Sequence, residues 1–195
     1  MELTKSTKQD LIHAAARELF WKHGFKRVSV EEVCEKAGVS KMTFYRFFPN
    51  KIELAKAVFD KVSKDGVEEF RAIMHSDIAS EEKMKQILLL KHEGSNQVSN
   101  EFLMDFYTSK ELGLKEYIEQ KTAELWQVML TDFKKAQQQG TFRKDFKPEF
   151  LLIVAQKLTE LFNDPALMQL YDNPQELVME FANLFIYGIS PVKES

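Results

Sequence analysis

A short segment near the N-terminus carries side chains that can bind anions or contact the edges of DNA bases. Its polar and exposed candidates are Lys41, Met42, Thr43, Tyr45 and Arg46. If the segment is helical, Phe44 and Phe48, which are four residues apart, take the inward face and leave these five on the outer face. Ammonium, guanidinium and hydroxyl groups on one helix face can bind phosphates or donate to base edges in a major groove. The segment is therefore a candidate DNA-reading helix.

The flanking residues predict a second short helix and a tight turn that position this face. Ser29-Val30-Glu31-Glu32 has the pattern of a capping box, which opens a helix ending near Ala37. Gly38 can adopt a positive φ, so the next helix can cross the first steeply, and Val39 fills the angle between them. Ser40 then caps the helix that runs from Lys41 to about Phe47. The pattern is that of a helix-turn-helix.

Helix N-termini and cations surround the candidate face. Ser40 and Asn50 each begin a helix, where free backbone N–H groups attract anions, and Lys51 adds a positive charge beside the second of these. The net charge of the chain is −3, yet residues 1–60 contain 11 Lys and Arg against 8 Asp and Glu. A basic head on an acidic body fits one phosphate-binding end.

The remainder of the chain predicts further helices and no strand. Apolar spacing places long helices over residues 7–24 and 51–75, and later ones over 80–93, 98–109, 112–139, 148–162 and 174–188, with a short one at 165–171. We expect an all-α fold of about nine helices: a three-helix DNA-binding domain over residues 1–50 and a helical ligand-sensing and dimerisation domain over residues 51–195.

Two sets of apolar residues in the second domain suggest binding surfaces. Residues 150–162 and 177–187 are apolar nearly all round, which favours one face packing on its own chain and the other on a second copy in a four-helix bundle. The dimer candidates are Phe150, Val154, Leu158, Leu161, Leu177, Phe181, Leu184 and Phe185. Aromatic and Met side chains suit an adaptable effector cavity, for which the candidates are Phe102, Phe106, Tyr107, Trp126, Met129 and Phe133. The alternatives are that the first set is the core of a monomer and the second an ordinary core.

The residues that usually carry catalysis or bind metal are poorly placed for either. His13, His23, His75 and His92 lack the spacing of metal ligands, and Cys34 falls on the inner face of its helix. No phosphate-binding loop, dinucleotide fingerprint or nucleophile elbow is found. We therefore expect no enzyme, metal or cofactor. A polar N-terminus, a single Cys and the absence of a long apolar run predict a cytoplasmic protein.

The N-terminal residues also resemble a known family. The motif runs Leu11-Ile12-x-x-Ala15-x-x-x-Leu19-Phe20-x-x-x-Gly24-Phe25, then Val30-x-x-Val33-Cys34-x-x-Ala37-Gly38-Val39-Ser40-Lys41-Met42-Thr43-Phe44-Tyr45-Arg46-Phe47-Phe48-x-x-Lys51-x-x-Leu54. It resembles the N-terminal signature of TetR-type regulators over about 45 residues, with Cys34 where Ala is common and Phe47 where His or another aromatic is common. The resemblance implies phosphate contacts by Tyr45 and Lys51 and groove reading by Lys41, Met42, Thr43 and Arg46. The full DNA-binding set is Arg27, Ser29, Ser40, Lys41, Met42, Thr43, Tyr45, Arg46, Phe47 and Lys51.

These observations predict a dimeric repressor that binds a palindromic operator in double-stranded DNA. A small apolar or amphipathic effector would shift the helix over residues 50–75 and release the DNA. One alternative is a DNA-binding dimer without small-molecule input, regulated by a protein partner or by its abundance. Another is a helical ligand-binding protein or enzyme whose helix-turn-helix is only structural. The operator, the regulated genes, the effector and the choice between repression and activation are not specified by the sequence.

Overall fold

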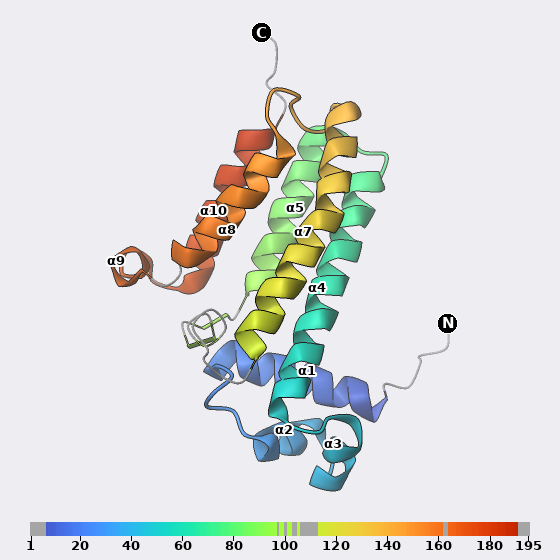
Figure 1. Cartoon of the computed structure of the whole chain (residues 1–195), viewed down its shortest axis with the longest axis vertical. Coiled ribbons are helices and arrows are strands. Elements are labelled where there is room, and N and C mark those ends of the chain that lie inside the picture. Colours follow the sequence, from blue (N-terminus) through green and yellow to red (C-terminus); the bar gives the residue numbers. More distant parts are fainter. Residues whose placement is uncertain are drawn as a thin grey trace. The chain divides into compact units, whose positions relative to one another are not determined.

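The computed structural model describes residues 7–96, 98–99, 101–102, 105, 113–161 and 164–190, which form helices and no strand. The helices are α1 (Lys8–His23), α2 (Val30–Ala37), α3 (Lys41–Phe47), α4 (Lys51–His75), α5 (Ser80–Ser95), α7 (Leu114–Gln138), α8 (Pro148–Leu161), α9 (Pro165–Met168) and α10 (Pro174–Ile189) (Figure 1). The predicted all-α fold is confirmed. The helix expected over residues 98–109 lies mostly outside the described residues.

Local capping interactions explain where the N-terminal helices begin and end. Thr7 and Asp10 form a capping box at the start of α1, and Ser29 and Glu32 form another at the start of α2. The Ser40 hydroxyl accepts a hydrogen bond from the backbone N–H of Thr43 at 3.2 Å, which caps α3. These bonds satisfy backbone donors that have no partner within the helix.

Contacts divide the chain into two compact units. The first comprises residues 1–62 and 97–118, and the second comprises residues 63–96 and 119–195. The helix-turn-helix expected as a domain over residues 1–50 therefore belongs to a larger unit. That unit also includes the first part of α4, the residues after α5 and the start of α7.

The first unit is built on the mutual packing of α1, α2 and α3 (Figure 1). Its core contains Ile12, Val33, Phe44 and Leu54, all completely buried. The ring of His13 makes an edge contact with the ring of Phe48, with 5.3 Å between centroids. The start of α4 thus shares a core with the three helices that precede it.

The second unit has its own apolar core. Its buried members are Phe70, Met74, Met84, Ile87, Phe133, Ala136, Phe142, Ile186 and Ile189, drawn from α4, α5, α7, the loop after α7 and α10. A buried Lys83 donates a hydrogen bond to the Met74 carbonyl at 2.8 Å, and Arg71 pairs with Asp132 at the same distance. Polar contacts as well as apolar packing therefore stabilise the second unit.

Candidate nucleic-acid interface

The outward face predicted for α3 is present in the structure. Lys41, Met42, Tyr45 and Arg46 are exposed and Thr43 is half-buried, whereas Phe44 and Phe48 are buried. The two inward rings contact each other, with 5.9 Å between centroids. The helical spacing thus separates an anchoring side from a side able to meet DNA.

Gly38 makes the turn between α2 and α3. Its φ of 64° and ψ of 35° lie in the left-handed region, which a residue with a Cβ adopts only at a cost. The Val39 N–H donates to the Cys34 carbonyl at 3.0 Å, and the Val39 side chain is half-buried. The predicted positive φ of Gly38 is confirmed, whereas the filling of the interhelical angle by Val39 stays a prediction.

The start of α2 combines capping residues with exposed charge. The Ser29 hydroxyl accepts from the Glu32 backbone N–H at 3.2 Å, and Glu32 accepts from the Ser29 N–H at 2.7 Å. The Ser29 hydroxyl also donates to the Glu32 carboxylate at 2.7 Å, and the bonds from the Ser29 backbone and hydroxyl hold the pKa of that carboxyl below its usual value. The capping box fixes the backbone at the start of α2. Arg27, just before it, is exposed and can contact an anion.

An ion pair links α2 to the first turn of α3. The Lys41 ammonium lies against a Glu31 carboxylate oxygen, and both side chains are more than half exposed. The hydrogen bond from Lys41 lowers the pKa of the Glu31 carboxyl, and the same contact raises the pKa of Lys41. Both groups therefore stay charged at neutral pH.

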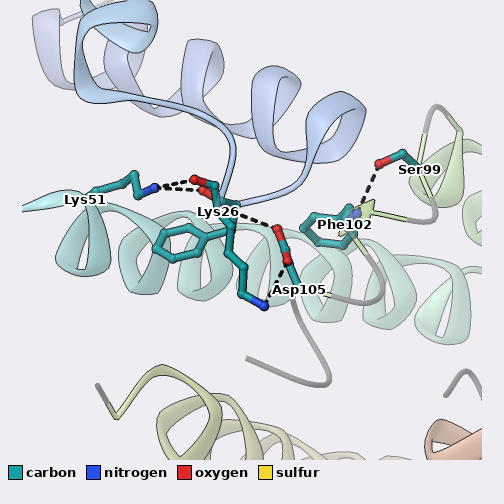
Figure 2. A network of polar contacts seen from close by, with 6 residues as sticks. Lys26, Lys51, Ser99, Phe102 and Asp105 are labelled. Carbon is teal, nitrogen blue, oxygen red and sulfur yellow. Dashed lines mark hydrogen bonds and ion pairs between the residues drawn. The ribbon is translucent and has the colours of Figure 1, made fainter. Parts of the chain in front are cut away.

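Lys51 is held by the loop between α1 and α2 (Figure 2). Its ammonium donates to the carbonyl oxygens of Phe25 at 2.9 Å, Lys26 at 3.2 Å and Val28 at 2.9 Å. It also lies 4.5 Å from the centroid of the Phe25 ring. These contacts give Lys51 a structural role that the sequence did not suggest, and its phosphate contact stays a prediction.

Asp105 holds the same loop from another part of the first unit (Figure 2). Its carboxylate accepts from the Lys26 backbone N–H at 2.8 Å and pairs with the Lys26 ammonium at 3.4 Å. Gly24 allows this approach, because a Cβ at Gly24 would lie 2.7 Å from an Asp105 oxygen. Sequence reasoning missed Asp105, since no local pattern connects residues 79 positions apart.

The residues after α5 also bind the end of α1. The Ser99 N–H donates to the Trp21 carbonyl at 2.9 Å. The Ser99 hydroxyl accepts from the Phe102 N–H at 3.1 Å (Figure 2). The rings of Trp21 and Phe102 pack with 4.3 Å between centroids. Ser99 and Phe102 therefore hold the end of α1, and Asp105 holds the loop that follows it.

The predicted effector residues divide between the two units. Phe102 lines a cavity of about 20 Å³ in the first unit, which has room for about one water molecule. Trp126, Met129 and Phe133 instead belong to the core of the second unit or pack against it. Phe106 and Tyr107 lie outside the described residues. Phe102 therefore belongs to the first unit and the three α7 residues to the second, and an effector cavity shared by them stays a prediction.

The predicted dimer residues are partly exposed and partly buried. Phe150, Leu161 and Leu184 are exposed, and Val154, Phe181 and Phe185 are half-buried. Leu177 has 0% exposure, so we correct its assignment: it faces the core of its own chain and offers no surface to a partner. The side chain of Leu158 lies outside the described residues.

The described residues contain no group of three or more His, Cys, Asp and Glu that could hold a metal ion. Cys34 is buried, and burial raises the pKa of its thiol, which opposes the thiolate form that a nucleophile needs. Within the part of the chain that the structure describes, no helix is both long and apolar enough to cross a membrane.

Comparison with known proteins points to one family. Residues 12–58 match the family model described as bacterial regulatory proteins, tetR family. The curated relative YdgC of Bacillus subtilis (strain 168), an uncharacterized HTH-type transcriptional regulator, is 25% identical over 95% of this chain and 93% of its own length.

Solved structures share the whole fold. The fatty acid degradation regulator FadR from Bacillus halodurans superimposes with a TM-score of 0.67 at 18% identity, covering 95% of this chain and 97% of its own. A putative transcriptional regulator from Saccharomonospora viridis, in complex with choline, gives a TM-score of 0.66 at 16% identity, covering 96% of this chain and 100% of its own. YdgC and these two proteins are described as regulators, in line with the expectation that this chain is not an enzyme.

Proposed function

Because this chain belongs to the TetR family of DNA-binding transcriptional regulators, we propose that it is a dimeric repressor whose α3 helices read a palindromic operator. The observation that carries the proposal is the exposed face of α3. It presents Lys41, Tyr45 and Arg46 to solvent while Phe44 and Phe48 anchor the helix from behind.

Reading of DNA by this unit requires two copies. One α3 helix offers only a few base contacts, and each good bidentate contact discriminates by about 1–3 kcal/mol. A dimer adds the contacts of two half-sites and the counterions released from both. A two-fold dimer therefore binds a palindrome of matching spacing.

Exposed apolar residues on α8 and α10 support dimerisation through these helices. Phe150 on α8 is 61% exposed and Leu184 on α10 is 65% exposed. Large apolar side chains that gather on one surface commonly mark an interaction site. Leu177 is removed from the set and the Leu158 side chain lies outside the described residues, so we assign the interface to Phe150, Val154, Leu161, Phe181, Leu184 and Phe185.

The effector is the part of the proposal that draws on other proteins. The Saccharomonospora viridis protein is in complex with choline, and the Bacillus halodurans protein is a regulator of fatty acid degradation, so we propose that this chain also responds to a small molecule. A coupling of about 1–3 kcal/mol between effector and operator gives roughly 5–150-fold release. Equal effector affinity for the free and the operator-bound dimer would exclude this switch.

One observation favours the alternative of a DNA-binding dimer without small-molecule input. Trp126, Met129 and Phe133 are engaged in core packing, and the cavity that Phe102 lines admits about one water molecule. A protein partner or the abundance of the regulator would then set the occupancy of the operator. Thermal denaturation of the full chain with a panel of amphipathic amines and fatty acids separates the two, because a ligand that binds only the folded state raises the melting temperature.

The first experiment is binding of the purified protein to the DNA upstream of its own gene. We expect two-fold symmetric protection that weakens with salt and is lost in Arg46→Ala. The matched control is Lys64→Ala, which removes an exposed cation from the second unit. Equal protection by both variants, or protection without symmetry, would contradict the assignment of α3 as the reading helix.

A further inference from the structure

The ion pair between Glu31 and Lys41 places a negative charge on the surface assigned to DNA. Glu31 lies in the first turn of α2 and Lys41 is the first residue of α3. Their side chains are 59% and 55% exposed, so neither charge is neutralised by burial. An acidic residue beside the lysine of a phosphate-binding surface requires an explanation.

Helix stability explains the position of Glu31 but not that of Lys41. The N-terminus of a helix carries partial positive charge, which favours a carboxylate and disfavours an ammonium. Glu31 is therefore well placed on α2, whereas Lys41 is unfavourably placed on α3. Lys41, with a carboxylate bound to it, is therefore better explained by what it contacts than by the stability of its helix.

While Lys41 is paired with Glu31, its binding to a phosphate is less favourable than its binding to a base edge. If Lys41 binds a phosphate, the Glu31 carboxylate faces a second anion at short range, and the paired ammonium releases fewer counterions. Guanine instead presents two neutral acceptors, O6 and N7. Because an ammonium has three N–H donors, Lys41 can bind both guanine atoms and keep its bond to Glu31.

We propose that Glu31 is a specificity-determining residue, which holds Lys41 away from phosphates and directs it to guanine in the major groove. The inference rests on the proposed function, since it assumes that α3 reads DNA. Glu31 thereby weakens binding to DNA of arbitrary sequence more than binding to the operator. It acts as a positioning residue through Lys41.

A second ion pair in the same unit provides a matched control. Glu18 on α1 pairs with Lys36 on α2 at 2.6 Å, and the Glu18 side chain is 55% exposed. Neither residue belongs to the predicted DNA-binding set. Glu18→Gln and Glu31→Gln each remove one negative charge from an exposed ion pair in the first unit, so the comparison separates the effect of position from that of net charge.

The test measures the affinity of the full chain for two duplexes over a fourfold range of salt. One duplex is selected by the wild-type protein from a random pool, and the other is a scrambled sequence of equal length. With Glu31→Gln, we expect the slope of log affinity against log salt on the scrambled duplex to steepen by about 0.9 for each head. We also expect the ratio of selected to scrambled affinity to fall severalfold, with no change in Glu18→Gln.

Lys41→Gln completes a double-mutant cycle, because Glu31→Gln should not steepen the slope once the lysine is gone. The proposal is overturned if Glu31→Gln matches Glu18→Gln. It is also overturned if Glu31→Gln weakens only the selected duplex, because Glu31 would then contact the operator itself. If wild-type protein selects no sequence, the proposed function fails, and the slope on scrambled DNA still decides whether Glu31 restrains Lys41.

Discussion

The contacts of Lys51 lead to a prediction that separates a structural role from a DNA-binding one. Lys51→Met keeps a long apolar side chain and removes the ammonium that donates to the carbonyls of Phe25, Lys26 and Val28. A hydrogen bond to a charged group contributes about 1.5–3 kcal/mol. Two of these carbonyls are only partly buried and one is exposed, so water replaces part of each bond. We therefore expect the free energy of unfolding to fall by about 2–4 kcal/mol in total.

The measurement is urea denaturation of the full chain followed by tryptophan fluorescence. A Trp126→Phe background makes Trp21 in the first unit the sole reporter. Lys41→Met is the control, because Lys41 is an exposed cation and surface substitutions usually change stability by less than about 0.5 kcal/mol. Unchanged unfolding of Lys51→Met, with weaker DNA binding and a shallower salt dependence, would refute the structural role and support a phosphate contact.

Three further predictions concern backbone conformation, protonation and dimerisation. Gly24→Ala combines a φ of 78° with a Cβ only 2.7 Å from an Asp105 oxygen, whereas Gly38→Ala has a φ of 64° and nothing within 4 Å of the new Cβ. We expect the free energy of unfolding in urea to fall by about 2–4 kcal/mol for Gly24→Ala and by about 1 kcal/mol for Gly38→Ala. Equal losses would show that the contact with Asp105 does not matter. Burial, helped by nearby Lys61, lowers the pKa of His13 from its usual 6.5, so the unfolded chain binds the proton more tightly and stability falls as the pH drops below about 6.5. In urea titrations between about pH 5 and 8, His13→Gln should make the free energy of unfolding less dependent on pH, and an unaltered pH profile would contradict this prediction. Leu184, on α10, is 65% exposed, and Leu89, on α5, is 55% exposed. In sedimentation, Leu184→Glu should convert the dimer to monomer and Leu89→Glu should not, and conversion by both variants or by neither would argue against the α10 interface.

The sequence alone predicted the elements that depend on near neighbours. Ser29 and Glu32 are three residues apart and cap α2 as expected, and Gly38 takes the left-handed conformation that the turn requires. The burial of Phe44 and Phe48 followed from helical spacing. Capping, turn formation and helix faces are set by residues within one or two turns of the chain, which a sequence displays directly.

Periodicity shows that a residue is buried but not what it is buried against. The same apolar spacing made Leu177 a candidate for the dimer surface, whereas it lies in the core of its own chain. Apolar residues satisfy a core and an interface equally well, because the hydrophobic effect has no direction.

Only the tertiary structure brought together the polar partners that lie far apart in the chain. Lys51 binds carbonyls up to 26 residues away, and Asp105 binds Lys26 across 79 residues. Neither partner has a distinguishing pattern in the sequence, since any backbone carbonyl or N–H can serve. The sequence therefore determined which helices form and which face of α3 is exposed. The fold decided which side chains hold that face in place, because only packing of distant segments sets the distances between them.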